Sequence, residues 1–246
     1  MKKNSIQKVI HYCWFGGKPL PESAKKCIQS WKRFLPDYRI IRWDENNFDV
    51  KSCIYSKEAY EKGKYAFVSD FARLKILYEE GGLYFDTDVE LIKPIPSEYL
   101  EYGFLGKQDK KYIATGLGFA CRKGDNTIKK MLDGYKDISF INEDGTFDET
   151  PCPMRNTKDL DADTLANNKL TILDADFMNP YNYRTGLLKT TKNTFSIHHS
   201  DASWWSESRR ARRAKRHFYV KKYGKTVGSL IYYIGRAICK VRGKND

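Results

Sequence analysis

The fold is decided by residues 66–90, AFVSDFARLKILYEEGGLYFDTDVE. Apolar residues recur at helical spacing over residues 69–80, which predicts an amphipathic helix whose N-cap is Ser69 or Asp70. Two glycines end this helix, and the apolar residues after them predict a buried strand over residues 83–92. A helix that returns directly into a buried strand is typical of an α/β sheet.

Two carboxylates, Asp86 and Asp88, follow the first residues of this strand, at the edge where open α/β sheets bind their ligands. Because side chains alternate along a strand, we expect both carboxylates on the same side. Their charges repel unless a cation lies between them, and a divalent cation with oxygen ligands meets this need. A solvated strand end without a function is the simpler alternative.

Asp70 and Arg73 lie one turn apart on one face of the predicted helix. The glycine pair returns the chain beside Asp86, so these two side chains are expected to form one wall of a site. A structural ion pair between them is the alternative, and it would occupy the same wall.

An earlier block, KVIHYCWFGG over residues 8–17, predicts a strand followed by a glycine-rich turn. Trp14 stands at the strand exit, where an aromatic face can stack on a nucleobase; a core tryptophan is the alternative. Gly16 allows the backbone to turn close to a ligand. His11 is expected to be a hydrogen-bonded strand histidine rather than a ligand.

A late block contains two adjacent histidines, His198 and His199, followed by Trp204. A histidine together with carboxylates suits Mn²⁺ or Mg²⁺, and the imidazole favours manganese. Neighbouring side chains of a strand point to opposite faces, so at most one histidine is expected to reach the metal directly.

Taken together, these three blocks resemble the DXD-containing sugar transferases of glycosyltransferase family 32. That family includes bacterial capsule and surface-polysaccharide transferases and the yeast initiating mannosyltransferase, with the clostridial glucosylating toxins as more distant relatives. The resemblance implies a GT-A-like fold, a nucleotide diphosphate-sugar donor, a divalent cation and retention of the anomeric configuration.

The resemblance also implies roles for individual residues. Asp88 would bind the metal, and Asp86 would bind the ribose, or the metal through water. Asp70 and Arg73 would hold hydroxyl groups of the donor sugar. The implied donor-binding set is Trp14, Gly16, Tyr84, Asp86 and Trp204, and the implied metal set is Asp88, Asp86, His199 and His198.

The choice between the histidines rests on the distant toxins, where an acidic metal ligand stands five residues before a tryptophan that covers the diphosphate. His199 stands five residues before Trp204, which favours His199 over His198. A histidine in place of an acidic residue departs from that pattern.

The remaining periodicity predicts strands over 6–13 and 38–43, helices over 21–35, 56–64 and 126–135, and short strands within 103–122, where residues 113–119 would wall the sugar site. Residues 140–168 are polar and rich in turns, and they are a candidate acceptor loop. The alternation predicts one α/β domain with a mixed central sheet, residues 1–206, and a basic helical extension, residues 207–246.

Six cysteines show no Cys-x-x-Cys pair and no disulfide-scaffold density. The N-terminus shows no secretory signal pattern, so we expect a protein of the reducing cytoplasm.

Positive charge is concentrated at the C-terminal end: residues 207–246 hold thirteen Lys and Arg residues against two acidic residues, in a chain of net charge +13. The apolar residues 230–234 are too few to span a bilayer. Basic flanks and a short tyrosine-rich apolar segment favour an anionic membrane surface, on the inner face of the cytoplasmic membrane. Packing of this extension on its own domain is one alternative; nucleic acid is not expected, because no reader motif is present.

The sequence thus predicts a metal-dependent glycosyltransferase that moves a hexose onto a surface polysaccharide or a lipid-linked glycan. A haloacid-dehalogenase-like phosphatase also carries Asp-x-Asp after a strand, but it expects Thr or Val where Glu90 stands. A catalytically silent, membrane-tethered scaffold is the other alternative, and it would need no metal.

Overall fold

The computed structural model describes residues 6–160, 164, 169–201 and 205–241. Its centre is a six-stranded sheet in the order β2-β1-β3-β6-β5-β7. These strands are β1 (Val9–Cys13), β2 (Arg39–Trp43), β3 (Gly82–Tyr84), β5 (Phe104–Gly106), β6 (Phe119–Cys121) and β7 (Thr171–Leu173). Two smaller sheets pair β4 (Val89–Leu91) with β10 (Ser196–His198), and β8 (Tyr181–Asn182) with β9 (Leu187–Leu188).

The helices are α1 (Glu22–Phe34), α2 (Ile54–Glu61), α3 (Tyr65–Glu80), α4 (Ser97–Tyr102), the short 3₁₀ helix η1 (Thr115–Leu117), α5 (Asn126–Asp133), α6 (Cys152–Lys158), α8 (Ala175–Met178), α9 (Glu207–Tyr223) and α10 (Lys225–Val241). The expected helices over 21–35, 56–64 and 126–135 correspond to α1, α2 and α5, with ends that differ by at most three residues.

Strand β3 lies near the middle of the sheet, parallel to β1 and antiparallel to β6. Its alternating side chains belong to two separate cores: Leu83 lies in the core that contains Trp31 of α1, whereas Tyr84 lies in the core that contains Phe71 of α3. Because both faces of β3 are covered, the chain that leaves its end is held from both sides. The α/β class and the mixed central sheet expected of a GT-A-like domain are confirmed.

Helix α3 begins earlier than the sequence predicts. Its first residue is Tyr65 and its N-cap is Lys64, so the assignment of Ser69 or Asp70 as N-cap is wrong. The buried side chains Phe67 and Val68 extend the apolar face by one turn, and the Ser69 hydroxyl donates to the Tyr65 carbonyl within the helix, at 3.0 Å.

The single strand expected over residues 83–92 is also wrong. β3 ends at Tyr84 and β4 begins at Val89, and the two strands belong to different sheets. Between them the Val89 N–H donates to the Asp86 carbonyl at 3.0 Å, which closes a tight turn. The Asp-x-Asp sequence therefore lies in a turn and not in a strand.

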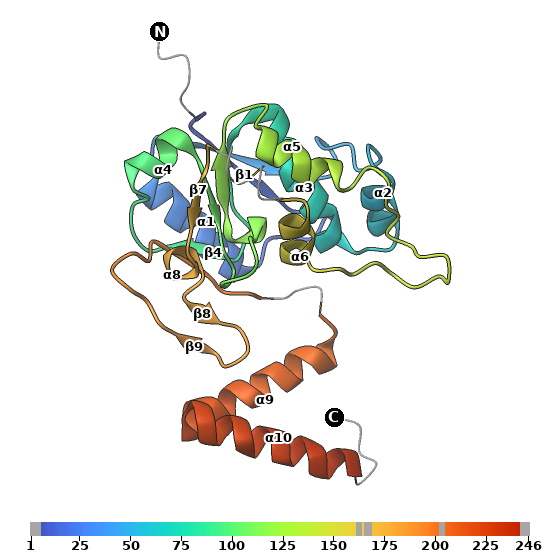
Figure 1. Cartoon of the computed structure of the whole chain (residues 1–246), viewed down its shortest axis with the longest axis vertical. Helices are drawn as coiled ribbons and strands as arrows, with labels where there is room; N and C mark the ends of the chain where they lie inside the picture. Colours follow the sequence, from blue (N-terminus) through green and yellow to red (C-terminus); the bar gives the residue numbers. More distant parts are fainter. Residues whose placement is uncertain (1–5, 161–163, 165–168, 202–204, 242–246) are drawn as a thin grey trace.

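The basic extension is helical, as expected, and forms a hairpin of α9 and α10 (Figure 1). Val220 of α9 and Tyr232 of α10 are buried, and a Cβ at Gly228 would collide with the backbone of Tyr219, so the two helices pack closely. Among the described residues, no helix is both long enough and apolar enough to cross a bilayer. The division of the chain after residue 206 stays a prediction.

Candidate functional site

The site lies where β3 ends. The turn after this strand brings together the side chains of Asp86 and Asp88, and His198 at the end of β10 joins them. One ligand atom from each of the three residues lies within 4.8 Å of the others. The expected strand alternation does not produce this convergence; the turn between β3 and β4 does.

The register of β10 on β4 decides which histidine takes part. His198 is paired with Val89, and its Nε2 lies 3.2 Å from Oδ1 of Asp88. The next side chain, His199, lies on the opposite face, where its Nε2 is 2.9 Å from Oε2 of Glu90. Against the preference for His199, the strand pairing places His198 at the aspartates. Which histidine binds the metal stays a prediction.

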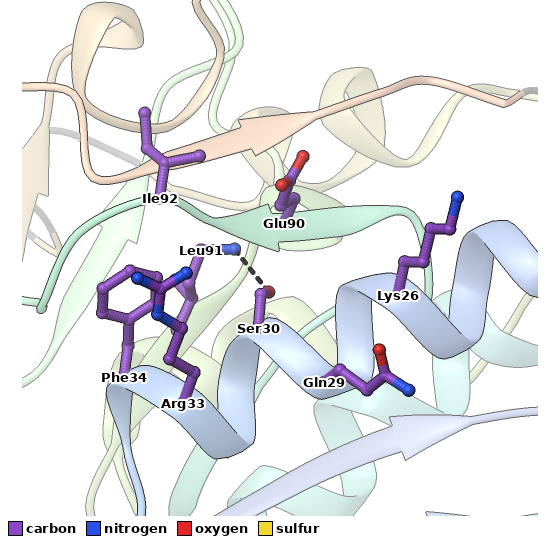
Figure 2. A pocket seen from close by; sticks show the side chains of 8 residues that line it. All are labelled: Lys26, Gln29, Ser30, Arg33, Phe34, Glu90, Leu91 and Ile92. Atoms are coloured by element: carbon purple, nitrogen blue, oxygen red, sulfur yellow. Dashed lines mark hydrogen bonds between the residues drawn. The ribbon is translucent and has the colours of Figure 1, made fainter.

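Glu90 marks the face that His199 occupies. Figure 2 shows it on β4 at a shallow groove against α1, with Lys26 and Arg33 along the helix. The Ser30 hydroxyl in this groove already accepts the Leu91 N–H, at 2.9 Å. The groove has no converging ligand set, and the aspartates do not line it.

Arg73 is the buried cation of the site, with 4% of its surface exposed. Its Nη2 lies 2.9 Å from Oδ1 of Asp70 and 3.1 Å from Oδ1 of Asp86. Its Nε–H donates to the Ser69 carbonyl at 3.1 Å, which fixes the guanidinium on α3. The ion pair that the sequence left as an alternative is thus present, and it includes a third partner, Asp86.

Tyr84 holds Asp86 through a hydrogen bond. Its hydroxyl donates to Oδ1 of Asp86 at 2.9 Å, and the Arg73 guanidinium lies 5.3 Å from its ring centroid. Only 1% of Tyr84 is exposed, so direct contact with a nucleotide is not available to it. Its place in the donor-binding set is corrected: it positions Asp86.

Burial and charge set the protonation of these groups. Burial raises the pKa of Asp70 to about 6, although Arg73 acts in the opposite direction. Burial also raises the pKa of Asp86, and Arg73 partly offsets this effect. For Asp88 burial is outweighed by His198 and by the Asp201 N–H, and its pKa falls to about 2. The carboxylate of Asp88 in turn raises the pKa of His198 against the effect of burial.

Residues 113–119 reach the site, as the sequence predicts, and a glycine among them leaves room for neighbouring side chains. A Cβ at Gly116 would lie 2.6 Å from Oδ2 of Asp86 and 3.1 Å from Nη1 of Arg73. A glycine at this position therefore allows η1 to approach the Asp86 carboxylate closely.

Helix α6 supplies residues that the sequence analysis missed, within the segment assigned as an acceptor loop. Asn156 donates to the Thr115 hydroxyl at 2.8 Å, and Nη1 of Arg73 lies 3.5 Å from the Cys152 sulfur. Burial raises the pKa of Cys152 to about 12, which keeps this thiol protonated near neutral pH. Cys152 and Asn156 stand four residues apart on a short helix, and only this spacing could have indicated that both side chains face the site. The acceptor role of residues 140–168 stays a prediction.

The first sequence block contributes one wall. Trp14 is half-buried, lines the cleft, and donates its indole N–H to the Lys18 carbonyl at 2.6 Å. Gly16 has φ +90°, and a Cβ there would collide with the ring of Tyr65, which itself lines the cleft. Gly16 therefore makes room for Tyr65 and does not itself line the cleft. Trp204 lies outside the described residues.

The whole cleft has a volume of about 1470 Å³ and extends from the aspartates to the C-terminal hairpin. Its far wall is cationic and aromatic, and comprises Arg184, Lys189, Trp205, Arg209, Arg213 and Lys225. The Arg209 guanidinium lies 3.9 Å from the Trp205 ring centroid. The basic extension thus takes part in the wall of the cleft, which its composition did not predict.

Residues 21–105, which include α1, α3 and the turn with both aspartates, match the family described as glycosyltransferase sugar-binding region containing DXD motif. Over this third of its length, the chain is similar to the DXD-containing glycosyltransferases. The match places Asp86 and Asp88 in the motif that gives this region its name.

Two curated proteins are similar to parts of the chain. One is Subversion of eukaryotic traffic protein A of Legionella pneumophila, 27% identical over 184 residues, which cover 62% of this chain and 28% of the relative. The other is a human alpha-1,4-N-acetylglucosaminyltransferase, 34% identical over 86 residues, 35% of this chain and 22% of the relative. The matched part of the chain thus spans about a quarter of the length of these relatives.

Two solved structures resemble the chain at low sequence identity. The PaToxG glycosyltransferase has a TM-score of 0.48 at 21% identity, covering 67% of this chain and 74% of its own. A glycosyltransferase involved in the glycosylation of the major capsid of PBCV-1 has a TM-score of 0.46 at 12% identity, and the match covers 85% of this chain and 98% of that one.

Proposed function

We propose that the protein transfers a hexose, with retention of configuration, from a nucleotide diphosphate-sugar to a hydroxyl group of a surface polysaccharide or lipid-linked glycan. The observation that carries this proposal is the convergence of Asp86, Asp88 and His198 within 4.8 Å in a cleft of the DXD region. The cleft volume of about 1470 Å³ exceeds the roughly 300–1,000 Å³ of a single small-molecule site, which leaves room for donor and acceptor.

The three converging side chains fit a divalent cation. Two carboxylates and one imidazole suit Mn²⁺, with Mg²⁺ as the harder alternative. When bound, such a cation acts as a Lewis acid that stabilises the departing diphosphate. Asp86, Asp88 and His198 would hold it.

The protein's own residues orient this set. Asp88 keeps its direction because its Oδ2 accepts the Asp201 N–H at 2.9 Å. Asp86 is held through Oδ1 by Tyr84 and Arg73. Groups fixed before the substrate arrives lower the cost of reaching the reactive geometry.

The same cleft offers partners for the donor. Asp70 lies in its wall and is held by Arg73, so its carboxylate is placed to accept hydrogen bonds from sugar hydroxyls. Arg73 itself is engaged by both aspartates, and its effect on the sugar would pass through Asp70. Trp14, which also lines the cleft, would offer an aromatic face for the base.

A screen of nucleotide-sugars tests the proposal. The full chain is incubated with UDP-, GDP- and other nucleotide-sugars, with Mn²⁺, Mg²⁺ or EDTA, and release of the nucleoside diphosphate is measured. We expect release with one class of donor, in the presence of metal, and its loss in the Asp88→Asn variant. Phosphate release from simple phosphomonoesters without donor turnover would support the phosphatase alternative instead.

We further propose that the protein works at the inner face of the cytoplasmic membrane, with the α9–α10 hairpin on the lipid surface. Val227, Leu230, Ile234 and Ile238 follow helical spacing along α10 and are all about half exposed or more. An exposed apolar stripe on a helix joined to a strongly basic one is typical of a segment that lies on an anionic leaflet. Each nearby basic residue would contribute roughly 1 kcal/mol.

Liposome flotation at low and high salt tests this placement. The Leu230→Ser/Ile234→Ser variant should lose binding to anionic vesicles, whereas Ile54→Ser, which changes an equally exposed isoleucine on α2, should not. Equal binding to neutral vesicles, or none to anionic ones, would refute the membrane proposal.

A further inference from the structure

The segment after His198 has an unusual backbone. Ser200 has φ +54°, and among the described residues it is the only non-glycine residue with positive φ. Such a conformation costs on the order of 1–3 kcal/mol and persists only where surrounding contacts impose it. We call residues 199–201 the Ser200 turn.

The Ser200 turn is bonded to two of the three residues that converge in the cleft. The His199 N–H donates to the Asp88 carbonyl, and the Asp201 N–H donates to Oδ2 of Asp88, both at 2.9 Å. The Ser200 hydroxyl lies 3.2 Å from Nδ1 of His198. The position of this turn therefore determines how Asp88 and His198 face each other.

On its other side the Ser200 turn is held by the basic helix α9. Nη1 of Arg213 donates to the Ser200 carbonyl at 2.5 Å, and Nη2 donates to the Asp201 carbonyl at 3.3 Å. One planar guanidinium thus bridges two successive carbonyl groups, which a single ammonium group cannot reproduce. The same guanidinium lies 5.2 Å from the ring centroid of Trp205, which fixes it from the side.

We propose that Arg213 is a positioning residue: it holds the Ser200 turn, and through it sets Asp88 and His198 for cation binding. The hairpin is then part of the site and not only a surface tail. The part of this inference that concerns the cation rests on the proposed function.

The test compares Arg213→Gln and Arg213→Lys with Arg210→Gln, which removes the same charge from an exposed position of the same helix. The first readout is the Kd for Mn²⁺ of the full chain, measured by electron paramagnetic resonance. Loss of an outer partner of a metal ligand costs roughly 10–100-fold in affinity, and we expect a loss in this range for Arg213→Gln. Arg213→Lys should be intermediate and Arg210→Gln close to wild type. Wild-type affinity in Arg213→Gln would overturn the proposal.

A second readout separates this inference from the proposed function. Hydrogen exchange of the Asp201 amide, measured without metal, should accelerate in Arg213→Gln and stay unchanged in Arg210→Gln. If the wild-type chain binds no Mn²⁺, the proposed function is refuted. Unchanged hydrogen exchange of the Asp201 amide in Arg213→Gln would refute the inference that Arg213 holds the Ser200 turn. Thermal unfolding of both variants shows whether a loss of affinity is merely a loss of fold.

Discussion

The guanidinium of Arg73 lies 3.1 Å from Oδ1 of Asp86, and this contact ties helix α3 to the turn after β3. The guanidinium is buried, the carboxylate is partly exposed, and the carboxylate also accepts the Tyr84 hydroxyl. An enclosed charge is tolerated when it is paired, and removing one partner leaves the other uncompensated. Arg73 therefore maintains the charge balance of the site as well as its geometry.

Replacement of Arg73 by alanine should cost about 3–5 kcal/mol in the free energy of unfolding, because Asp70 and Asp86 lose their shared cation. Arg73→Lys should be nearly as damaging to turnover, since one ammonium group cannot reproduce the contacts to Ser69, Asp70 and Asp86 together. Urea denaturation and donor hydrolysis measure the two effects, with the exposed Arg33→Lys as control. A fully active Arg73→Lys variant would reduce Arg73 to a replaceable ion pair.

Local patterns in the sequence predicted the elements that surround the site. Helical spacing and the glycine pair located α3 and β3, and the order of charged residues placed Asp70, Arg73 and Asp86 together. These contacts lie within one helix-turn-strand unit, so their geometry follows from local structure alone.

Contacts between distant segments were not predictable in the same way. The choice of His198 depends on the register of β10 on β4, and a shift by one residue would have presented His199 instead. Arg213 could not be separated from its many basic neighbours, because its role depends on two carbonyl groups of a distant turn. The periodicity of apolar residues indicates which side chains are buried, but not which distant segments of the chain contact each other.

The two histidines should differ sharply in metal affinity. His198→Ala removes a side chain of the converging set, and the loss of Mn²⁺ affinity should exceed the roughly 10–100-fold cost of losing an outer partner. His199→Ala removes only the contact with Glu90 and keeps the backbone bond to Asp88, so its affinity should stay near wild type. Titration of both variants with Mn²⁺ measures this, and the reverse order would restore His199 as the ligand.

Gly116→Ala should damage the site while the fold persists. The new Cβ would lie 2.6 Å from Oδ2 of Asp86, so the carboxylate or η1 must move. A displacement of about 1 Å at a reacting group can cost on the order of 100-fold in rate, and we expect a fall in kcat of this size. Gly235→Ala is the control: its Cβ meets nothing within 4 Å, and alanine should stabilise α10 by roughly 0.5–1 kcal/mol. Unchanged turnover in Gly116→Ala would show that the carboxylate has room to adjust.

The buried His11 should make the stability of the fold depend on pH. Only 2% of His11 is exposed, the Trp43 indole donates to its Nδ1 at 2.9 Å, and its Nε2 therefore carries the hydrogen that faces the Gly81 carbonyl at 3.1 Å. Burial lowers the pKa of His11 to about 4, whereas an unfolded histidine titrates near 6.5.

Between these two pKa values the unfolded chain binds a proton that the folded chain does not bind, so stability falls as the pH drops from about 6.5 to about 4. The His11 contribution to this loss should amount to about 3 kcal/mol. Other groups also titrate in this range, and Asp70, whose pKa is raised to about 6, acts with the opposite sign. The measured quantity is therefore the difference between wild type and His11→Gln in urea denaturation at pH 7 and pH 4. The variant should be less stable at pH 7 and should lose less stability on acidification, and parallel profiles for the two proteins would contradict the assignment of a neutral, buried imidazole.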